Sequence, residues 1–102
     1  MFKRISIATA QEMLQSAATV ADIRDPAAFA NGHIAGAVNL NNENLADFIA
    51  TAPTDIPLLV FCYHGNSSQP AAQYLAEQGF QEVYSVDGGM AAWQLQYPVS
   101  SD

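Results

Sequence analysis

The stretch PLLVFCYHGNSSQP, residues 57–70, decides the fold class of this chain. Residues 57–61 are continuously apolar, which is typical of a parallel strand covered on both faces. Residues 62–68 are small or polar, and a helical pattern begins at Gln69 and Pro70, where proline suits the first turn. This order of strand, short loop and helix predicts one unit of a parallel α/β fold, with Cys62 at the carboxyl end of the strand.

Cys62 is the only cysteine in the chain, and its position favours reactivity. A thiol that faces the N-terminus of a helix meets unpaired amides and the positive end of the helix dipole, and both stabilise a thiolate. The same amides would form an anion-binding nest. We therefore expect Cys62 to be a nucleophile, the alternative being a small buried hydrophobic residue. The expected donors are the backbone amides of Tyr63, His64, Gly65, Asn66, Ser67 and Ser68.

Strand and helix patterns alternate through the rest of the chain. Apolar runs predict further strands near residues 5–7, 20–23, 37–40 and 83–86, and helical spacing predicts helices near 10–16, 27–30, 43–50, 69–79 and 90–95. Thr9 with Glu12 is expected to cap the first helix as a capping box, and Ser68 or Gln69 to cap the helix after the Cys62 loop. The alternation predicts an α/β fold with three layers: a central, mostly parallel sheet with helices on both faces.

Size and composition limit the functions to consider. The chain has 102 residues, the size of one domain, and half of them are hydrophobic. Ten acidic residues against three basic ones give a formal charge of -7, so binding to nucleic acid or to an anionic membrane is not expected. A single cysteine allows no internal disulfide and suits a reducing compartment. No stretch is apolar enough for a signal peptide or a membrane span, so we expect a cytoplasmic protein.

Segments spread along the chain resemble the signatures of the rhodanese family. DIRDP at residues 22–26, followed by GHI at 32–34 and GAVNL at 36–40, is similar to the N-terminal signature of the family. CYHGNSS at 62–68 is similar to the active-site loop, and DGG at 87–89 with Ala92 and Trp93 is similar to the C-terminal signature. The resemblance covers nearly the whole chain and implies a single rhodanese domain over residues 1–102, most similar to the small single-domain bacterial members.

The resemblance implies a thiosulfate sulfurtransferase with a ping-pong mechanism and no cofactor. The Cys62 thiolate would take the outer sulfur of thiosulfate, release sulfite and hold a persulfide, which the loop amides would stabilise. Cyanide in an assay, or a thiol or dithiol such as thioredoxin in the cell, would then accept the sulfur. Two-domain relatives bind anionic substrates with basic loop residues; because this loop has none, we expect weak binding of thiosulfate.

Arg24 is the sole arginine beyond the N-terminus, and two roles are open for it. It can form a structural ion pair with Asp22, Asp25 or Asp87, or it can contact an anionic substrate. We favour the ion pair, because the sequence supplies carboxylates close to Arg24 on both sides.

The other candidate residues have structural interpretations. His64 is expected to face solvent and only tune the local field, and His33 is expected to be a hydrogen-bonded structural histidine. Trp93 is expected in the core, and Gly88 with Gly89 in a tight turn, because no phosphate-binding glycine motif surrounds them. The spacing of histidine and cysteine residues does not predict a metal site.

Rival functions can be tested against single residues. A cysteine phosphatase needs an arginine after five intervening residues, because a guanidinium must grip the phosphate, but that count from Cys62 gives Ser68. A thioredoxin-like oxidoreductase needs a second thiol, and the chain has none. The remaining alternative is a persulfide carrier or a partner-binding module that does not use thiosulfate as its natural donor. The oligomeric state is left open.

Overall fold

The computed structural model describes residues 1–101, and this part of the chain forms a five-stranded sheet in the order β1-β5-β4-β2-β3. Its strands are β1 (Lys3–Ile5), β2 (Thr19–Asp22), β3 (Val38–Asn39), β4 (Leu58–Phe61) and β5 (Val83–Val86). The helices are α1 (Ile7–Leu14), α2 (Pro26–Asn31), α3 (Leu45–Thr51), α4 (Ser68–Glu77) and α5 (Gly89–Gln96). Every pair of neighbouring strands is parallel, which confirms the predicted fold class.

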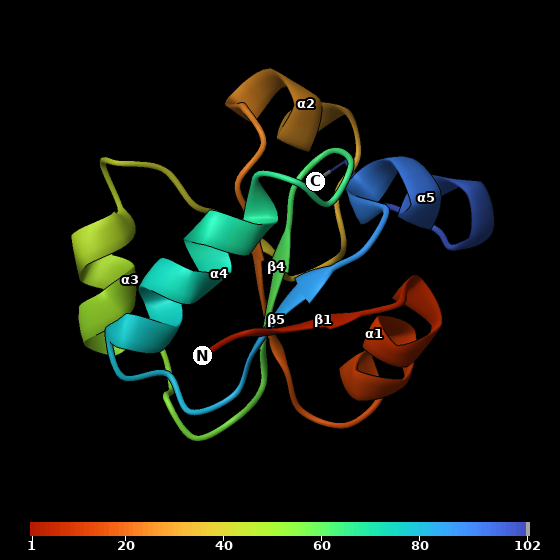
Figure 1. The fold of residues 1–102 in the computed structure, drawn as a ribbon. Helices are drawn as coiled ribbons and strands as arrows, with labels where there is room; N and C mark the ends of the chain where they lie inside the picture. Colours follow the sequence, from red (N-terminus) through yellow and green to blue (C-terminus); the bar gives the residue numbers. More distant parts are fainter. Residues whose placement is uncertain (102) are drawn as a thin grey trace.

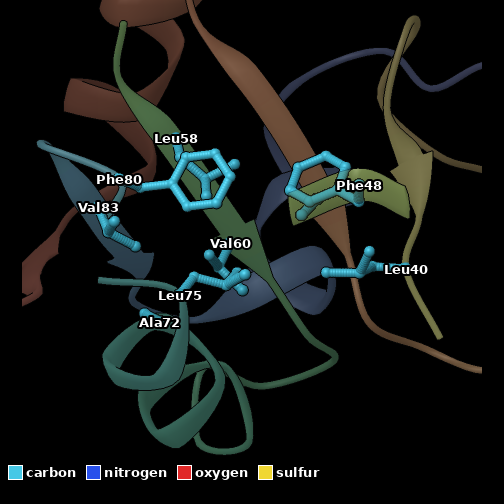
Figure 2. Close-up of a cluster of buried hydrophobic side chains, with 9 residues drawn as sticks. Leu40, Phe48, Leu58, Val60, Ala72, Leu75, Phe80 and Val83 are labelled. Carbon is cyan, nitrogen blue, oxygen red and sulfur yellow. The ribbon is translucent and has the colours of Figure 1, made fainter. Parts of the chain in front are cut away.

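β4 lies at the centre of the sheet and is covered on both faces. Leu58 and Val60 pack with side chains from α3 and α4, in the cluster drawn in Figure 2. Leu59 and Phe61 pack on the opposite face with side chains from α1 and α5. All of these β4 side chains are 0% exposed, and burying each one stabilises the fold by about 1.5–3 kcal/mol. Figure 1 shows the resulting layers, with α3 and α4 on one side of the sheet and α1 and α5 on the other.

The helix predicted near residues 43–50 is present, although it starts at Leu45. In α3, Phe48 is buried, and Leu45 and Ile49 pack against the same cluster. Asn44 is the N-cap, but its side chain makes no capping hydrogen bond. The side chain instead accepts from the Asn41 amide and donates to the Asn39 carbonyl oxygen at the end of β3, so it fixes the approach to the helix.

The predicted start of the first helix is wrong. α1 begins at Ile7, and Ser6 is its N-cap, because Ser6 Oγ accepts a hydrogen bond from the Thr9 amide at 3.1 Å. Thr9 therefore lies inside the helix and does not form a capping box with Glu12. The earlier start lets Ile7 pack against the α1–α5 face of the sheet and limits β1 to Lys3–Ile5.

The N-cap of the helix after the Cys62 loop also lies earlier in the chain than predicted. Ser67 is the N-cap of α4, and Ser68, one of the two predicted caps, is the first helical residue. The helix ends at Glu77, two residues before the predicted end. Gly79 follows the C-cap with a φ of 107°, and Phe80 joins the cluster of Figure 2. The Ser68 side chain is not available for capping because it contacts Cys62, as described below.

Candidate active site

Cys62 directly follows β4 and opens the loop that leads into α4, as the sequence predicted. It is 5% exposed. Its Sγ accepts hydrogen bonds from the Gly65 amide at 3.1 Å and from the Ser68 amide at 3.2 Å. The hydroxyl oxygen of Ser68 lies 3.3 Å from the same sulfur. The loop therefore curls around the sulfur and surrounds it with neutral donors.

Opposing effects act on the pKa of Cys62. Burial raises the pKa of the thiol, because it disfavours the charged form. The Ser68 hydroxyl and the amides of Ser68, Gly65 and His64 lower the pKa, because each stabilises the thiolate. These contacts outweigh burial, so the pKa of Cys62 lies below that of an ordinary cysteine. The nucleophilic thiolate is therefore populated at a lower pH than in a free cysteine.

A second hydroxyl, which the sequence analysis missed, lies behind Ser68. Ser85 in β5 places its Oγ 2.8 Å from the Ser68 Oγ, and both residues are 0% exposed. A Cys62 thiolate can only accept a hydrogen bond, so Ser68 donates to it, and the Ser68 oxygen is then free to accept from Ser85. The two serines form a chain of hydroxyls that ends on the sulfur and is anchored in the neighbouring strand.

The other loop amides do not contact the sulfur. Within residues 1–101, no hydrogen bond joins the amides of Tyr63, Asn66 or Ser67 to Sγ of Cys62. In the same part of the chain, the amides of Asn66 and Ser67 donate to no other group either. These amides are donors that a ligand in the loop can use.

Arg24 lies in a buried ion pair. Its Nε is 3.0 Å and 3.1 Å from the two carboxylate oxygens of Asp22, and its Nη2 is 2.7 Å from Asp22 Oδ2 and 2.7 Å from the Gly32 carbonyl oxygen. Asp22 is 1% exposed and Arg24 9%. The other expected partners are engaged elsewhere: Asp25 caps α2, and Asp87 accepts from another arginine. No hydrogen bond joins Arg24 to the loop 62–68 in the described part of the chain.

The two histidines have different surroundings. His33 is 5% exposed, its Nδ1 donates to the Phe29 carbonyl oxygen at 2.7 Å, and its ring stacks on Phe29 with centroids 3.9 Å apart. These contacts fit the predicted structural role. His64 is exposed and stacks on the exposed Tyr63 ring at a centroid distance of 4.8 Å. Its side chain makes no hydrogen bond to Cys62 within residues 1–101.

The reactive group that this geometry prepares is the Cys62 sulfur. Among residues 1–101, no group of three or more His, Cys, Asp or Glu side chains is arranged to hold a metal ion. None of the helices in that range combines the length and the apolar character needed to cross a membrane. A buried thiolate held by amides and a hydroxyl can attack an electrophilic atom and can keep a second sulfur anion in the same environment.

Comparisons with known proteins identify the family. The family model of the rhodanese-like domain matches residues 6–96. The thiosulfate sulfurtransferase GlpE of Ectopseudomonas mendocina is 59% identical over 95% of this chain and 89% of its own length. GlpE of Pseudomonas aeruginosa strain PAO1 is 50% identical over 98% of this chain and 91% of its own. Among solved structures, a rhodanese-related protein from Thermoplasma volcanium superposes with a TM-score of 0.84 at 31% identity, covering 99% of this chain and 100% of that one. By sequence and fold, the chain belongs to the family of rhodanese-like domains.

Proposed function

We propose that this protein is a thiosulfate sulfurtransferase in which Cys62 carries the transferred sulfur as a persulfide. The observation that carries the proposal is the set of neutral donors around the buried Cys62 sulfur, from Gly65 and Ser68. The GlpE relatives are named as thiosulfate sulfurtransferases and share 59% and 50% identity with nearly all of this chain, which supports thiosulfate as the donor.

In the first step, the Cys62 thiolate attacks the outer sulfur of thiosulfate. A bond forms between the two sulfurs, and the bond from the outer sulfur to the sulfite sulfur breaks. Sulfite leaves with the electron pair of that bond, and no proton is transferred. The product is a Cys62 persulfide anion, with the negative charge on its outer sulfur.

The loop can stabilise this persulfide with donors that the resting thiolate does not use. The amides of Asn66 and Ser67 have no partner within residues 1–101, and they belong to the loop that curls around Cys62. An outer sulfur held by these amides would occupy an anion-binding nest at the start of α4. The whole set of proposed donors is the run of backbone amides from residue 63 to residue 68.

In the second step, an acceptor attacks the outer sulfur and restores the Cys62 thiolate. Cyanide would leave as thiocyanate. A dithiol such as thioredoxin would take the sulfur on one thiolate. Its second thiol would then attack that sulfur-bearing cysteine, pass its proton to the departing sulfur, release hydrosulfide and leave a disulfide. Both routes balance without a cofactor.

A persulfide carrier is the second candidate, and one observation favours it. The loop 62–68 contains no lysine or arginine, and Arg24 is already paired with Asp22. Thiosulfate is a dianion, and only neutral donors meet it here, so we propose that it binds weakly. A carrier would receive sulfur from the persulfide of another protein and would not need to bind a dianion.

Intact mass measurement tests the proposal and separates the two candidates. Incubation with thiosulfate should increase the mass by one sulfur atom and release an equal amount of sulfite, and Cys62→Ser should lose both the adduct and transfer to cyanide. A Cys62→Ser variant with full activity would exclude the assigned nucleophile. A wild-type protein that takes sulfur from a protein persulfide but not from thiosulfate would be a carrier.

A further inference from the structure

The first turn of α5 is hydrogen-bonded to the start of the Cys62 loop. The Met90 amide donates to the carbonyl oxygen of Cys62 at 2.8 Å, and the Ala91 amide donates to the carbonyl oxygen of Tyr63 at 2.9 Å. Amides in the first turn of a helix have no partner within the helix, so they are available for such contacts. Here they satisfy the first two carbonyls of the active-site loop.

These two hydrogen bonds fix which way the loop peptides face. In a planar trans peptide the carbonyl and the following N–H point in opposite directions. When Ala91 holds the Tyr63 carbonyl on the α5 side, the His64 N–H is turned to the other side. The His64 amide is among the groups that lower the pKa of Cys62, which fits this orientation.

Glycines allow the helix to approach this closely. A Cβ at Gly89 would lie 2.4 Å from the carbonyl oxygen of Cys62 and 2.7 Å from that of Tyr63. A Cβ at Gly65 would lie 2.8 Å from the backbone nitrogen of Gly88. No side chain fits at these distances without a shift of the backbone. The sequence predicted a tight turn at Gly88 and Gly89. In the structure, these two glycines are also where α5 meets the active-site loop.

We propose that the first turn of α5 is a positioning element, in which the Met90 and Ala91 amides, brought close by Gly89, hold the first two peptides of the loop so that the His64 amide faces the Cys62 sulfur. The inference rests on the proposed role of Cys62 as the nucleophile. It adds that the reactivity of this sulfur depends on a helix that makes no hydrogen bond to Sγ within residues 1–101.

Gly89→Ala and Ala91→Pro test this element. Gly89→Ala should push the two carbonyls away from α5. Ala91→Pro removes the amide that donates to Tyr63 and puts a ring carbon against the Tyr63 carbonyl oxygen, so that carbonyl must also move. The helix itself should tolerate proline there, because Pro70 already occupies the third position of α4, as Ala91 does in α5. Losing one well-oriented amide should raise the apparent pKa of Cys62 by about one to two units in Gly89→Ala, and in the same direction in Ala91→Pro.

The control is Gly36→Ala. Gly36 has a φ of 84°, in the same left-handed region as Gly89 at 56°, but a Cβ there meets nothing within 4 Å. Both alanine variants carry backbone strain, so both should unfold at lower urea concentration than the wild type. Only the Gly89 variant should also shift the titration of Cys62.

The readout is the rate of alkylation by iodoacetamide as a function of pH. The reagent is uncharged, its rate follows the thiolate fraction, and Cys62 is the only cysteine in the chain. If Gly89→Ala does not fold, Ala91→Pro decides alone. Folded variants with the wild-type profile would overturn the positioning role. If Cys62 of the wild type titrated like a free cysteine, that result would instead contradict the proposed function. Failure of the positioning role and failure of the proposed function therefore give different results.

Discussion

Ser68→Ala removes the hydroxyl that lies 3.3 Å from the Cys62 sulfur and keeps the backbone amides that bond to it. A hydrogen bond to a charged group contributes about 1.5–3 kcal/mol. Because about 1.4 kcal/mol corresponds to one pKa unit, the pKa of Cys62 should rise by about one to two units. The amides still stabilise the thiolate, so the Cys62 pKa should stay below the value that burial alone would produce.

The same change has a second effect, on stability. Ser85 is 0% exposed, and its hydroxyl bonds to Ser68. Without that partner, the buried hydroxyl of Ser85 is left unsatisfied, which costs about 1–3 kcal/mol of unfolding free energy. Ser85→Ala alone should lower stability less and should move the Cys62 pKa only slightly, because Ser68 still reaches the sulfur. In the double variant no hydroxyl is orphaned, so part of the stability lost in Ser68→Ala should return.

Two measurements separate these effects. Iodoacetamide alkylation across a pH series gives the Cys62 pKa, and urea unfolding at neutral pH gives the free energy of unfolding of all four proteins. The expected pattern is a pKa that stays high in the double variant and a stability loss smaller than the sum of the two single losses. An unchanged pKa in Ser68→Ala, or fully additive stability losses, would refute the hydroxyl chain.

Two further predictions concern ionised groups. Because folding lowers the pKa of Cys62, the thiolate's contribution to stability is complete above the unfolded pKa of about 8.5 and is lost as the pH falls through the folded pKa. The difference in unfolding free energy between the wild type and Cys62→Ser should therefore rise with pH until the pH reaches the unfolded pKa. Urea unfolding at several pH values measures this difference, and a difference that does not change with pH would contradict the prediction. Arg24→Ala should cost about 3–5 kcal/mol by leaving the Asp22 charge buried and unpaired, with a near-normal KM for thiosulfate in the folded fraction. The control Arg4→Ala breaks an exposed ion pair with Asp87 and should lower the unfolding free energy by at most about 1 kcal/mol. If Arg24→Ala instead kept its stability and had a much higher KM, Arg24 would bind the substrate.

The features that the sequence predicted correctly rest on strong local patterns. The apolar run at 58–61 is typical of a strand covered on both faces, and the structure buries its alternate side chains against different helices. The change from that run to small polar residues marks the strand end, so the position of Cys62 follows without knowledge of the rest of the fold. Spacing alone also found the apolar face of α3, because Leu45, Phe48 and Ile49 repeat with the period of a helix.

The features that the sequence did not predict depend on contacts between distant segments. Ser85 lies in a strand that reads VYSV, and nothing local indicates that its hydroxyl meets Ser68 across the sheet. The role of Gly89 is hidden for the same reason, because its neighbours belong to a loop more than twenty residues earlier in the chain. At the first helix, Ser6 and Thr9 are both good N-caps, and packing of the helix on the sheet chooses between them.

Position 68 explains in physical terms why this loop suits sulfur better than phosphate. It is the place where the residue count of a cysteine phosphatase requires an arginine, and here a fully buried serine points its hydroxyl at Cys62 and at Ser85. A guanidinium at this site would have to enter a packed region and displace a donor to the sulfur. The Arg24 guanidinium does not replace it, because it is held by the Asp22 carboxylate. Neutral donors can stabilise a sulfur anion with a single charge, but the transfer of a phosphoryl group spreads more charge over several oxygens and needs a cation that the loop 62–68 does not supply. Ser68, which leaves the loop without the arginine of a phosphatase, is thus also the residue whose hydroxyl and amide contact the Cys62 sulfur.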